Sequence, residues 1–402
     1  MSEQERIIIE TVECEKAAFI EASHQISKNP ELQNQEFFAS RLLTELLEKR
    51  GFWVKRDIAG HKTGFIAEFG GDKPGPAIAF LAEYDALPDI GHGCGHNIIG
   101  ALSALAAVSL AAVMGQTGGT VFVYGTPAEE GGDNGSAKAS FVDQGFFDGI
   151  DAALLLHPGC RNDLTGPSLA VKCYAFSFFG KTAHASACPE DGINALDAMI
   201  LFYNGINALR QQCPSDARIH GIITDGGTAP NVIPDFSKAK FYVRSSTKER
   251  ADILLEKVVK IAEGAALATG CTYKAEKFNN DVDDTVTNDA FDRLFQQNAA
   301  KVGMEYTLPE QKAKGSSDVG NVSHAVPVIQ PGLKVSETEI PGHTVEFRDA
   351  CISTLADESL ASGAKALALT AYTLLVDPQK LEEMKGLHRT GRDQKLALAN
   401  KH

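Results

Sequence analysis

The most informative stretch of the chain for chemistry is the pentapeptide His-Gly-Cys-Gly-His at 92–96. It follows an apolar run with strand character at 77–83 and precedes a long apolar run typical of a buried helix. Thiolate and imidazole both suit zinc-like ions, and the intervening glycines let the backbone fold closely around a cation. The spacing makes Cys94, His96 and His92 candidate metal ligands. A buried thiol and hydrogen-bonded core histidines are the alternative for this stretch taken alone.

Two further strand-like runs end in side chains that could join this site. The run 120–125 leads into Pro-Ala-Glu-Glu at 127–130, and the run 152–156 ends at His157. In open α/β sheets, ligands bind outside the carboxyl ends of the strands, so side chains at several strand ends converge in one crevice. This convergence favours a metal site over the alternative for Glu129 and Glu130, which is a solvated acidic turn.

The elements that must position these residues fall into two patterns. Up to about residue 170, apolar strands alternate with helical segments, which predicts an α/β fold with a mostly parallel sheet. From 171 the order becomes strand, helix, strand, strand, helix, strand, as in a ferredoxin-like α+β domain. These six elements are expected at 171–179, 191–212, 218–224, 236–245, 247–269 and 271–278. We therefore predict a catalytic domain in two parts, 1–170 and 282–402, with an inserted domain at 171–281.

Composition excludes several functions. The net charge of -14 over 402 residues argues against a nucleic-acid partner, which needs a concentrated basic face. The apolar run 98–114 is rich in alanine and too short for a membrane span, so we expect a core helix and no membrane partner. The first residues lack the features of a signal peptide, which predicts a cytoplasmic protein. Neither a nicotinamide-binding glycine loop nor a Gly-x-Ser-x-Gly motif is present.

Seven motifs, in this order, resemble those of the aminoacylase/carboxypeptidase family of dinuclear metallohydrolases. The likeness is to its amidohydrolase branch, which contains hippurate, indole-acetyl-amino-acid and p-aminobenzoyl-glutamate hydrolases. The motifs are Asp-Ala-Leu-Pro at 85–88, Cys-Gly-His at 94–96, Pro-Ala-Glu-Glu at 127–130, His157, Gly-Lys-Thr-Ala-His-Ala-Ser at 180–186, Gly-Gly-Thr-Ala-Pro-Asn-Val-Ile-Pro at 226–234 and Pro-Gly-His at 341–343. The chain departs from the branch at Asn97 and Glu83, where aspartate is common.

The resemblance implies a zinc-peptidase-like catalytic domain that binds two divalent metal ions. Zinc is favoured by the thiolate ligand, and manganese and cobalt are alternatives in this branch. Glu129 matches the general base, and Asp85 matches a carboxylate that orients a ligand imidazole. The positions that match the metal ligands are Cys94, His96, Glu130, His157 and His343.

The inserted domain is implied to act as a lid and dimerisation domain, so that a homodimer is the catalytic unit. His184 matches a histidine that reaches the scissile carbonyl from the partner subunit, where it would stabilise the oxyanion. Asn231 and Arg244 match positions that bind a free carboxylate on a small-molecule substrate. Asp318 is near the site by resemblance, although turn composition accounts for it equally well.

These residues predict a metal-dependent amidohydrolase that cleaves the amide bond of an N-acyl or N-aroyl amino acid. A dipeptidase or carboxypeptidase of the same family is the alternative, since both would use the same chemistry. A metal-binding scaffold without turnover is the alternative outside enzymes, and the intact Glu129 argues against it.

Overall fold

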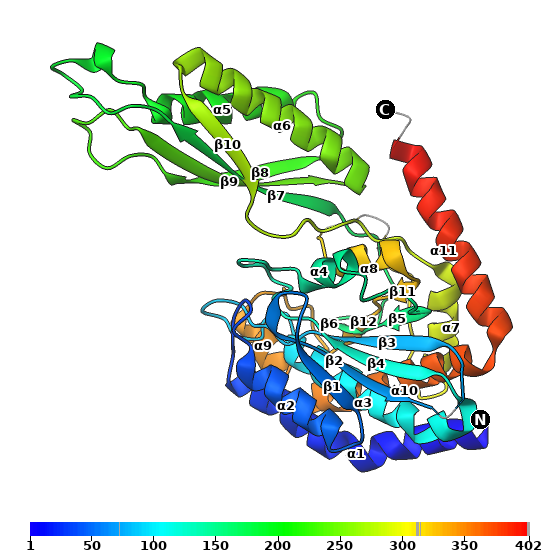
Figure 1. Ribbon diagram of the computed structural model, residues 1–402. Coiled ribbons are helices and arrows are strands. Elements are labelled where there is room, and N and C mark those ends of the chain that lie inside the picture. Colours follow the sequence, from blue (N-terminus) through cyan, green and yellow to red (C-terminus); the bar gives the residue numbers. More distant parts are fainter. Residues whose placement is uncertain (72, 311–312, 314, 400–402) are drawn as a thin grey trace. The chain divides into compact units, whose positions relative to one another are not determined.

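The computed structural model describes residues 1–71, 73–310, 313 and 315–399. It divides into two compact units (Figure 1). Among the described residues, the larger unit comprises 1–71, 73–167, 285–310, 313 and 317–397, and the smaller unit comprises 168–284, 315–316 and 398–399. The second unit is therefore inserted in the sequence of the first.

The larger unit is built on a six-stranded sheet of order β1-β2-β4-β3-β5-β11. Pairings among β4, β3, β5 and β11 are parallel, whereas β1 with β2 and β2 with β4 are antiparallel, so the predicted mostly parallel sheet is confirmed. A separate parallel pair joins β6 to β12. The strands are β1 (Trp53–Ile58), β2 (His61–Gly70), β3 (Ala77–Ala82), β4 (Thr120–Gly125), β5 (Ala152–Leu154), β6 (His157–Gly159), β11 (Val328–Ile329) and β12 (Gly332–Lys334).

Helices cover both faces of this sheet (Figure 1). Successive side chains of a strand point to opposite faces of the sheet and therefore join different apolar clusters. Phe80 packs with helices α1, α3 and α10 on one face, and its neighbour Leu81 packs with α4 and α8 on the other. The helices of this unit are α1 (Glu3–Lys28), α2 (Phe37–Glu48), α3 (His96–Thr117), α4 (Ala137–Asp143), α7 (Asp289–Ala300), α8 (Val319–Ala325), α9 (Val345–Ala350), α10 (Thr354–Val376) and α11 (Pro378–Ala399).

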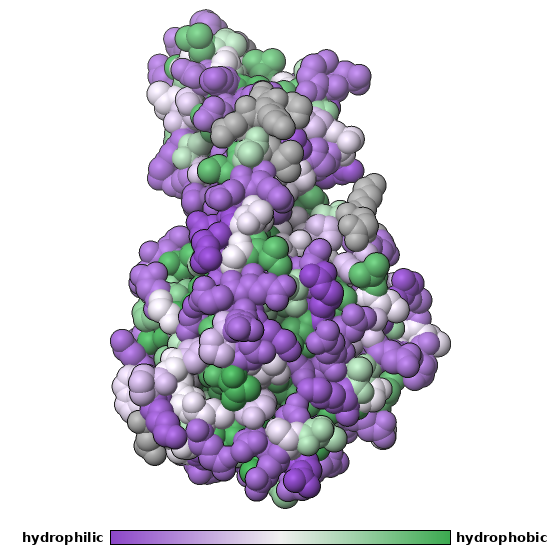
Figure 2. Space-filling view, turned by 90° about the vertical axis from the view of Figure 1, so that its right-hand side faces the viewer, coloured by the Kyte–Doolittle hydropathy of each residue, from purple (hydrophilic) through white to green (hydrophobic). Residues whose placement is uncertain are grey.

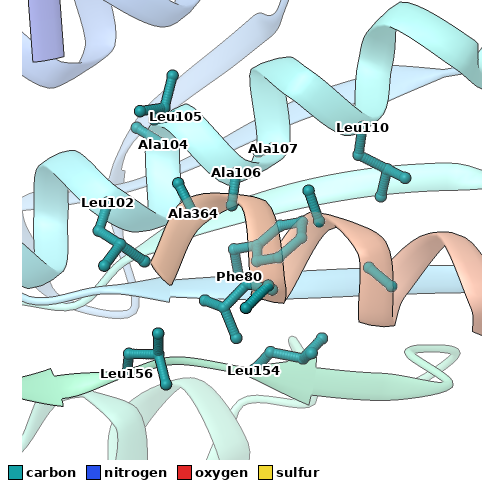
Figure 3. Packing of buried hydrophobic residues seen from close by; sticks show 14 of the residues in the cluster. Phe80, Leu102, Ala104, Leu105, Ala106, Ala107, Leu110, Leu154, Leu156 and Ala364 are labelled. Carbon is teal, nitrogen blue, oxygen red and sulfur yellow. The ribbon is translucent and has the colours of Figure 1, made fainter. Parts of the chain in front are cut away.

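Helix α3 lies at the centre of the larger core. Figure 3 shows its leucine and alanine side chains packed around Phe80 of β3, with Leu154 and Leu156 on one side and Ala364 of α10 nearby. Both α3 and α10 are long and apolar enough to cross a membrane by length and composition, but 89% and 67% of their most apolar windows are buried in the protein. The prediction that 98–114 form a buried core helix therefore agrees with the packing of α3.

The smaller unit has the predicted ferredoxin-like order of elements. Its antiparallel sheet has the order β10-β7-β9-β8, and α5 and α6 pack on it through one apolar cluster. The elements are β7 (Ala170–Phe179), α5 (Ala195–Arg210), β8 (Arg218–Asp225), β9 (Phe236–Ser245), α6 (Lys248–Thr269) and β10 (Thr272–Lys277). Figure 2 shows a mostly hydrophilic face with scattered apolar residues, as expected for an acidic chain.

The first helices and α5 are bounded by local sequence signals. Helices α1 and α2 are separated by a segment that contains Pro30, since proline disfavours a helical conformation in the preceding residue. Helix α5 begins at Ala195 instead of 191, because Pro189–Asp191 forms a short 3-10 turn. The side chain of Asn194 then caps α5 by accepting from the Leu196 and Asp197 N–H groups.

Candidate metal centre

The loop between β3 and α3 carries the first two donor side chains. Gly95 has φ +79°, and an added Cβ would lie 2.6 Å from Pro158 Cβ, so the position requires glycine. This turn places Cys94 just before the N-cap residue Gly95 and makes His96 the first residue of the helix. The sequence around the turn therefore fixes where the thiol and the imidazole enter the site.

Asp85 anchors His96 and the loop of Glu130 together. Its Oδ1 lies 2.9 Å from His96 Nδ1, and its Oδ2 accepts the Glu130 backbone N–H at 3.0 Å. His96 Nδ1 is thereby engaged, while Nε2 has no hydrogen-bond partner among the described residues. Burial is the largest influence on His96 and opposes its protonation, but Asp85 and Cys94 together outweigh it and raise the pKa of the ring well above its usual value. The predicted orienting role of Asp85 is consistent with these contacts.

The Glu129 and Glu130 side chains follow a strained turn. Ala128 has φ 55°, a left-handed conformation that is unfavourable for alanine and is found at functional sites. The turn is held from both sides, because the Ala128 N–H donates to Glu36 Oε1 at 3.1 Å and its carbonyl accepts the Ser136 N–H at 2.6 Å. Surrounding hydrogen bonds therefore maintain the conformation that presents both glutamates.

Glu130 lies between two histidines. Its Oε1 is 3.3 Å from His343 Nε2 and 4.0 Å from His96 Nε2. Burial disfavours the carboxylate, but the hydrogen bond from His343 and the charge of His96 lower its pKa to about 2. For Glu129, burial and the charges of Glu83 and Asp318 act in the same direction and raise the pKa. The pKa values of the two adjacent carboxyl groups are thus shifted in opposite directions in the metal-free protein.

His157 and His343 complete the donor set from two other segments. His157 Nε2 lies 3.6 Å from Cys94 Sγ, and its Nδ1 lies 2.9 Å from the Pro158 carbonyl oxygen, which fixes the ring. His343 also has a left-handed backbone, φ 62°, and its N–H donates to the Gly93 carbonyl at 2.8 Å. This bond ties the His343 loop to the turn that carries Cys94.

The donor atoms form overlapping groups that fit metal ions. Within each group, the candidate ligand atoms all lie within 4.8 Å of one another. The groups are Cys94 with His96 and His157, Cys94 with Glu130 and His343, and His96 with Glu129 and Glu130. Two donors on one tetrahedral zinc ion are about 3.4 Å apart for nitrogen and oxygen and about 3.6 Å when one is sulfur. The observed separations of 3.3 and 3.6 Å agree with this, so the residues present fit a metal centre.

Two residues near the donors have other environments. His92 is 1% exposed, and burial lowers its pKa to about 3, so the ring is neutral; it belongs to none of the three groups. Asn97, where the branch often has aspartate, donates from Nδ2 to Ser23 Oγ at 2.9 Å and to the Cys351 carbonyl at 3.3 Å. An aspartate could donate neither bond, which gives a physical reason for the amide.

Sequence reasoning missed Lys138. This lysine on α4 is 0% exposed, and its Nζ lies 2.7 Å from Glu83 Oε1 and 2.6 Å from Asp318 Oδ1. Asp318, for which turn composition was the alternative explanation, is therefore part of a buried ionic network beside the donors. The only sign in the sequence that this lysine is buried is that alanines flank it on both sides, at Ala137 and Ala139, and this does not identify its carboxylate partners.

The smaller unit carries the three remaining predicted site residues. His184 and Asn231 lie together on exposed segments. The backbone of His184 forms an isolated antiparallel β-bridge with Val232, and the Ala185 N–H donates to the Asn231 carbonyl at 3.0 Å. Arg244 pairs with Val171 near the other end of β9. The eight-residue step from Phe236 to Arg244 spans roughly 26 Å at the usual strand rise. Asn231 precedes β9 and Arg244 lies near its other end, so within one chain the two residues lie toward opposite ends of this strand.

Arg244 is held locally. Its Nη1 donates to Ser316 Oγ at 2.7 Å and its Nε to His220 Nε2 at 3.3 Å, while the guanidinium lies 5.5 Å from the Tyr242 ring centroid. An arginine near the end of a strand is often free in solvent, and these contacts instead restrict the guanidinium.

Comparisons with known proteins agree with this architecture. The family pattern described as a peptidase dimerisation domain matches residues 170–269. An Xaa-Arg dipeptidase from Mus musculus is 36% identical over 375 residues, which cover 90% of this chain and 86% of the relative. One of the chains of the p-aminobenzoyl-glutamate hydrolase of Escherichia coli is 30% identical over 469 positions, covering 97% of this chain and 95% of the relative.

The fold is also found in a solved structure. A Bacillus subtilis protein described as a dinuclear metal-binding peptidase of the M20 family superposes with a TM-score of 0.62 at 21% identity, and the match covers 90% of this chain and 99% of that one. The match in fold and the identity to the dipeptidase over nine-tenths of the chain agree. The chain therefore belongs to the M20 peptidase family and is a metal-dependent hydrolase of amide bonds.

Proposed function

We propose that this chain is a dipeptidase that hydrolyses the amide bond preceding a C-terminal amino acid with a free carboxylate. The observation that carries the proposal is the convergence of the donor groups with Glu129, whose carboxylate lies within 4.8 Å of the donor atoms of His96 and Glu130. An acid that lies beside the proposed metal ligands without being one of them can accept a proton from an attacking water.

The proposed centre holds two divalent ions. The residues that would bind them are Cys94, His96, Glu130, His157 and His343. When bound, the ions would polarise the scissile carbonyl and lower the pKa of water. Zinc is the first ion to test because a thiolate is present, with manganese and cobalt as alternatives. The solved M20 relative, described as binding a dinuclear metal, supports this number of ions.

The chain's own residues have separate tasks in the proposed reaction. Glu129 takes a proton from the attacking water and delivers it to the leaving amine. Asp85 holds the His96 ring by Nδ1 and the Glu130 loop by its backbone N–H, so both donors keep their directions. His184 donates a hydrogen bond to the developing oxyanion, and Asn231 or Arg244 binds the substrate carboxylate.

The proposed catalytic unit is a homodimer. The match to a peptidase dimerisation domain supports this assembly. The length of β9 adds a physical reason, because Asn231 and Arg244 of one chain are separated by too great a distance to bind the same carboxylate. If both residues act on one substrate, one of them must come from the partner subunit.

Two observations favour a dipeptide over an N-acyl substrate. The mouse and human relatives at 36% and 34% identity are both described as Xaa-Arg dipeptidases. The alignment to the E. coli aroyl-glutamate hydrolase extends over 469 positions although this chain has 402 residues, so that relative contains insertions. The aroyl-glutamate hydrolase activity is the second candidate. It is supported by the alignment of this chain with 95% of that relative.

A substrate panel tests the proposal. The zinc-loaded and manganese-loaded protein would be assayed with dipeptides ending in arginine, lysine or glutamate, with N-acetyl amino acids and with p-aminobenzoyl-glutamate. We expect the highest kcat/KM for a dipeptide, and loss of activity when the C-terminal carboxylate is amidated or the metal is removed by a chelator. Equal or higher kcat/KM for p-aminobenzoyl-glutamate would select the second candidate.

A further inference from the structure

A buried ionic chain lies directly behind the metal donors. Glu83 follows strand β3, Lys138 is on α4, and Asp318 precedes α8; the side chains of all three are 0% exposed. None of the three belongs to the donor set described above. Three charged groups without solvent are costly to bury unless each is compensated.

Lys138 and Asp318 compensate each other. Lys138 Nζ is 2.6 Å from Asp318 Oδ1, and the Lys138 backbone N–H donates to Asp318 Oδ2 at 3.1 Å, so both carboxylate oxygens are used. This pair is electrically neutral. Glu83 therefore adds a second buried carboxylate to a single lysine, so these three side chains together carry one net negative charge, which faces the His96 ring.

The unused oxygen of Glu83 is directed at the metal site. Lys138 Nζ lies 2.7 Å from Oε1, whereas Oε2 lies 3.3 Å from His96 Nε2. Neither Oε2 nor His96 Nε2 has a hydrogen-bond partner among the described residues, and His96 Nδ1 is already engaged by Asp85. The 3.3 Å separation is the one expected, about 3.4 Å, for oxygen and nitrogen donors on one tetrahedral ion.

The geometry points to Glu83 as a further carboxylate ligand of the metal centre, held toward His96 by Lys138. The inference rests on the metal centre proposed above and enlarges its ligand set. Lys138 is then a positioning residue, which fixes one carboxylate oxygen and leaves the other for the ion. A bound cation would also neutralise the remaining negative charge of the network.

The competing explanation is that Glu83 only stabilises Lys138. Substitution of Glu83 by glutamine separates the two explanations, because the neutral Lys138–Asp318 pair remains and the amide keeps the size of the side chain. The matched control is Asp292→Asn, another buried carboxylate changed to its amide; the hydrogen bonds described for its side chain come from Thr165, and neither residue is among the donors.

Zinc titration by calorimetry, with metal content measured after dialysis, tests the inference on wild-type, Glu83→Gln and Asp292→Asn proteins. We expect Glu83→Gln to weaken zinc binding at one site at least tenfold and to reduce the zinc-induced rise in Tm, whereas Asp292→Asn binds as wild type. A change smaller than tenfold in Glu83→Gln would overturn the inference. Wild-type protein that binds no zinc would instead refute the metal centre itself.

A second measurement does not depend on a variant that folds. In a crystal structure of the zinc-loaded wild-type chain, we expect Glu83 Oε2 at about 2.0–2.2 Å from an ion. A zinc ion bound by His96 with Glu83 Oε2 beyond about 3 Å would overturn the inference and leave the five-residue donor set intact.

Discussion

The metal donors of the larger unit and the substrate-binding candidates of the smaller unit are held in opposite ways. His96 is fully buried, its ring is fixed by Asp85, and its neighbours are fixed by further hydrogen bonds. His184 and Asn231 are exposed, and the partners described for them are mainly adjacent loop atoms. The comparison indicates that the larger unit is preorganised, whereas the groups proposed for the smaller unit would be completed by substrate or by another subunit.

The largest expected effect tests the preorganised side of this comparison. Glu129→Gln removes the proton acceptor but keeps the shape of the side chain, so kcat should fall by about 10³-fold. Because Glu129 is separate from the proposed ligands, metal content by elemental analysis should stay at the wild-type value. Wild-type kcat in this variant would refute the assignment of Glu129 as the base.

The next effect tests the exposed side. His184→Ala should lower kcat by about 10²-fold or more by removing an oxyanion donor, without changing metal content. If His184 acts on the partner's substrate, co-expressed Glu129→Gln and His184→Ala chains form mixed dimers in which one of the two sites is intact. Half of the random dimers are mixed, so activity should recover to about a quarter of wild type. Recovery no greater than the sum of the two single variants would place both residues in one chain's site.

Asp85→Asn tests whether the anchoring of the donors matters. The asparagine oxygen can still accept one hydrogen bond, but the amide nitrogen cannot accept the Glu130 N–H. Metal affinity should fall about 10–100-fold, measured by competition with a chromophoric chelator. Unchanged affinity would show that the Asp85 contacts are not needed to direct the donors.

The same contrast explains how far sequence reasoning reached. Strand β9 was predicted with its observed bounds, and its buried residues alternate strictly along the strand. Cys94, Glu130 and His157 were predicted to converge because they follow strands whose carboxyl ends share an edge, whereas His343 entered the proposed donor set only through the resemblance of its motif. Lys138 could not be found this way, since a lysine in sequence indicates an exposed position and only the folded chain brings Glu83 and Asp318 to it.

The distance between Asn231 and Arg244 could not be predicted from their motifs for a related reason. Thirteen residues separate them in sequence, and an extended strand converts most of that interval into distance. Motifs identify the residue types of the smaller unit's site. Their arrangement depends on strand length and on assembly, and neither follows from motif spacing.

The smallest expected effect concerns a buried carboxylate remote from the proposed chemistry. Asp292 is 4% exposed, and burial raises its pKa from the ordinary 3.8 to about 6, although the Thr165 N–H and hydroxyl donate to its Oδ1. Since the folded pKa is raised, the stabilising contribution of the protonated group is complete below pH 3.8 and is lost as the pH rises through about 6. Over the roughly two units between these values, the lost stability is about 3 kcal/mol.

Asp292→Asn should therefore be more stable than wild type at pH 8, by about 1–3 kcal/mol, because the amide oxygen can accept both Thr165 hydrogen bonds without carrying a charge. At about pH 4 the advantage should fall below about 1 kcal/mol, since the wild-type carboxyl is then protonated in the folded chain. Urea denaturation of the metal-free proteins at both pH values measures the difference. An advantage that is equal at the two pH values would mean that the charge of Asp292 is not its cause.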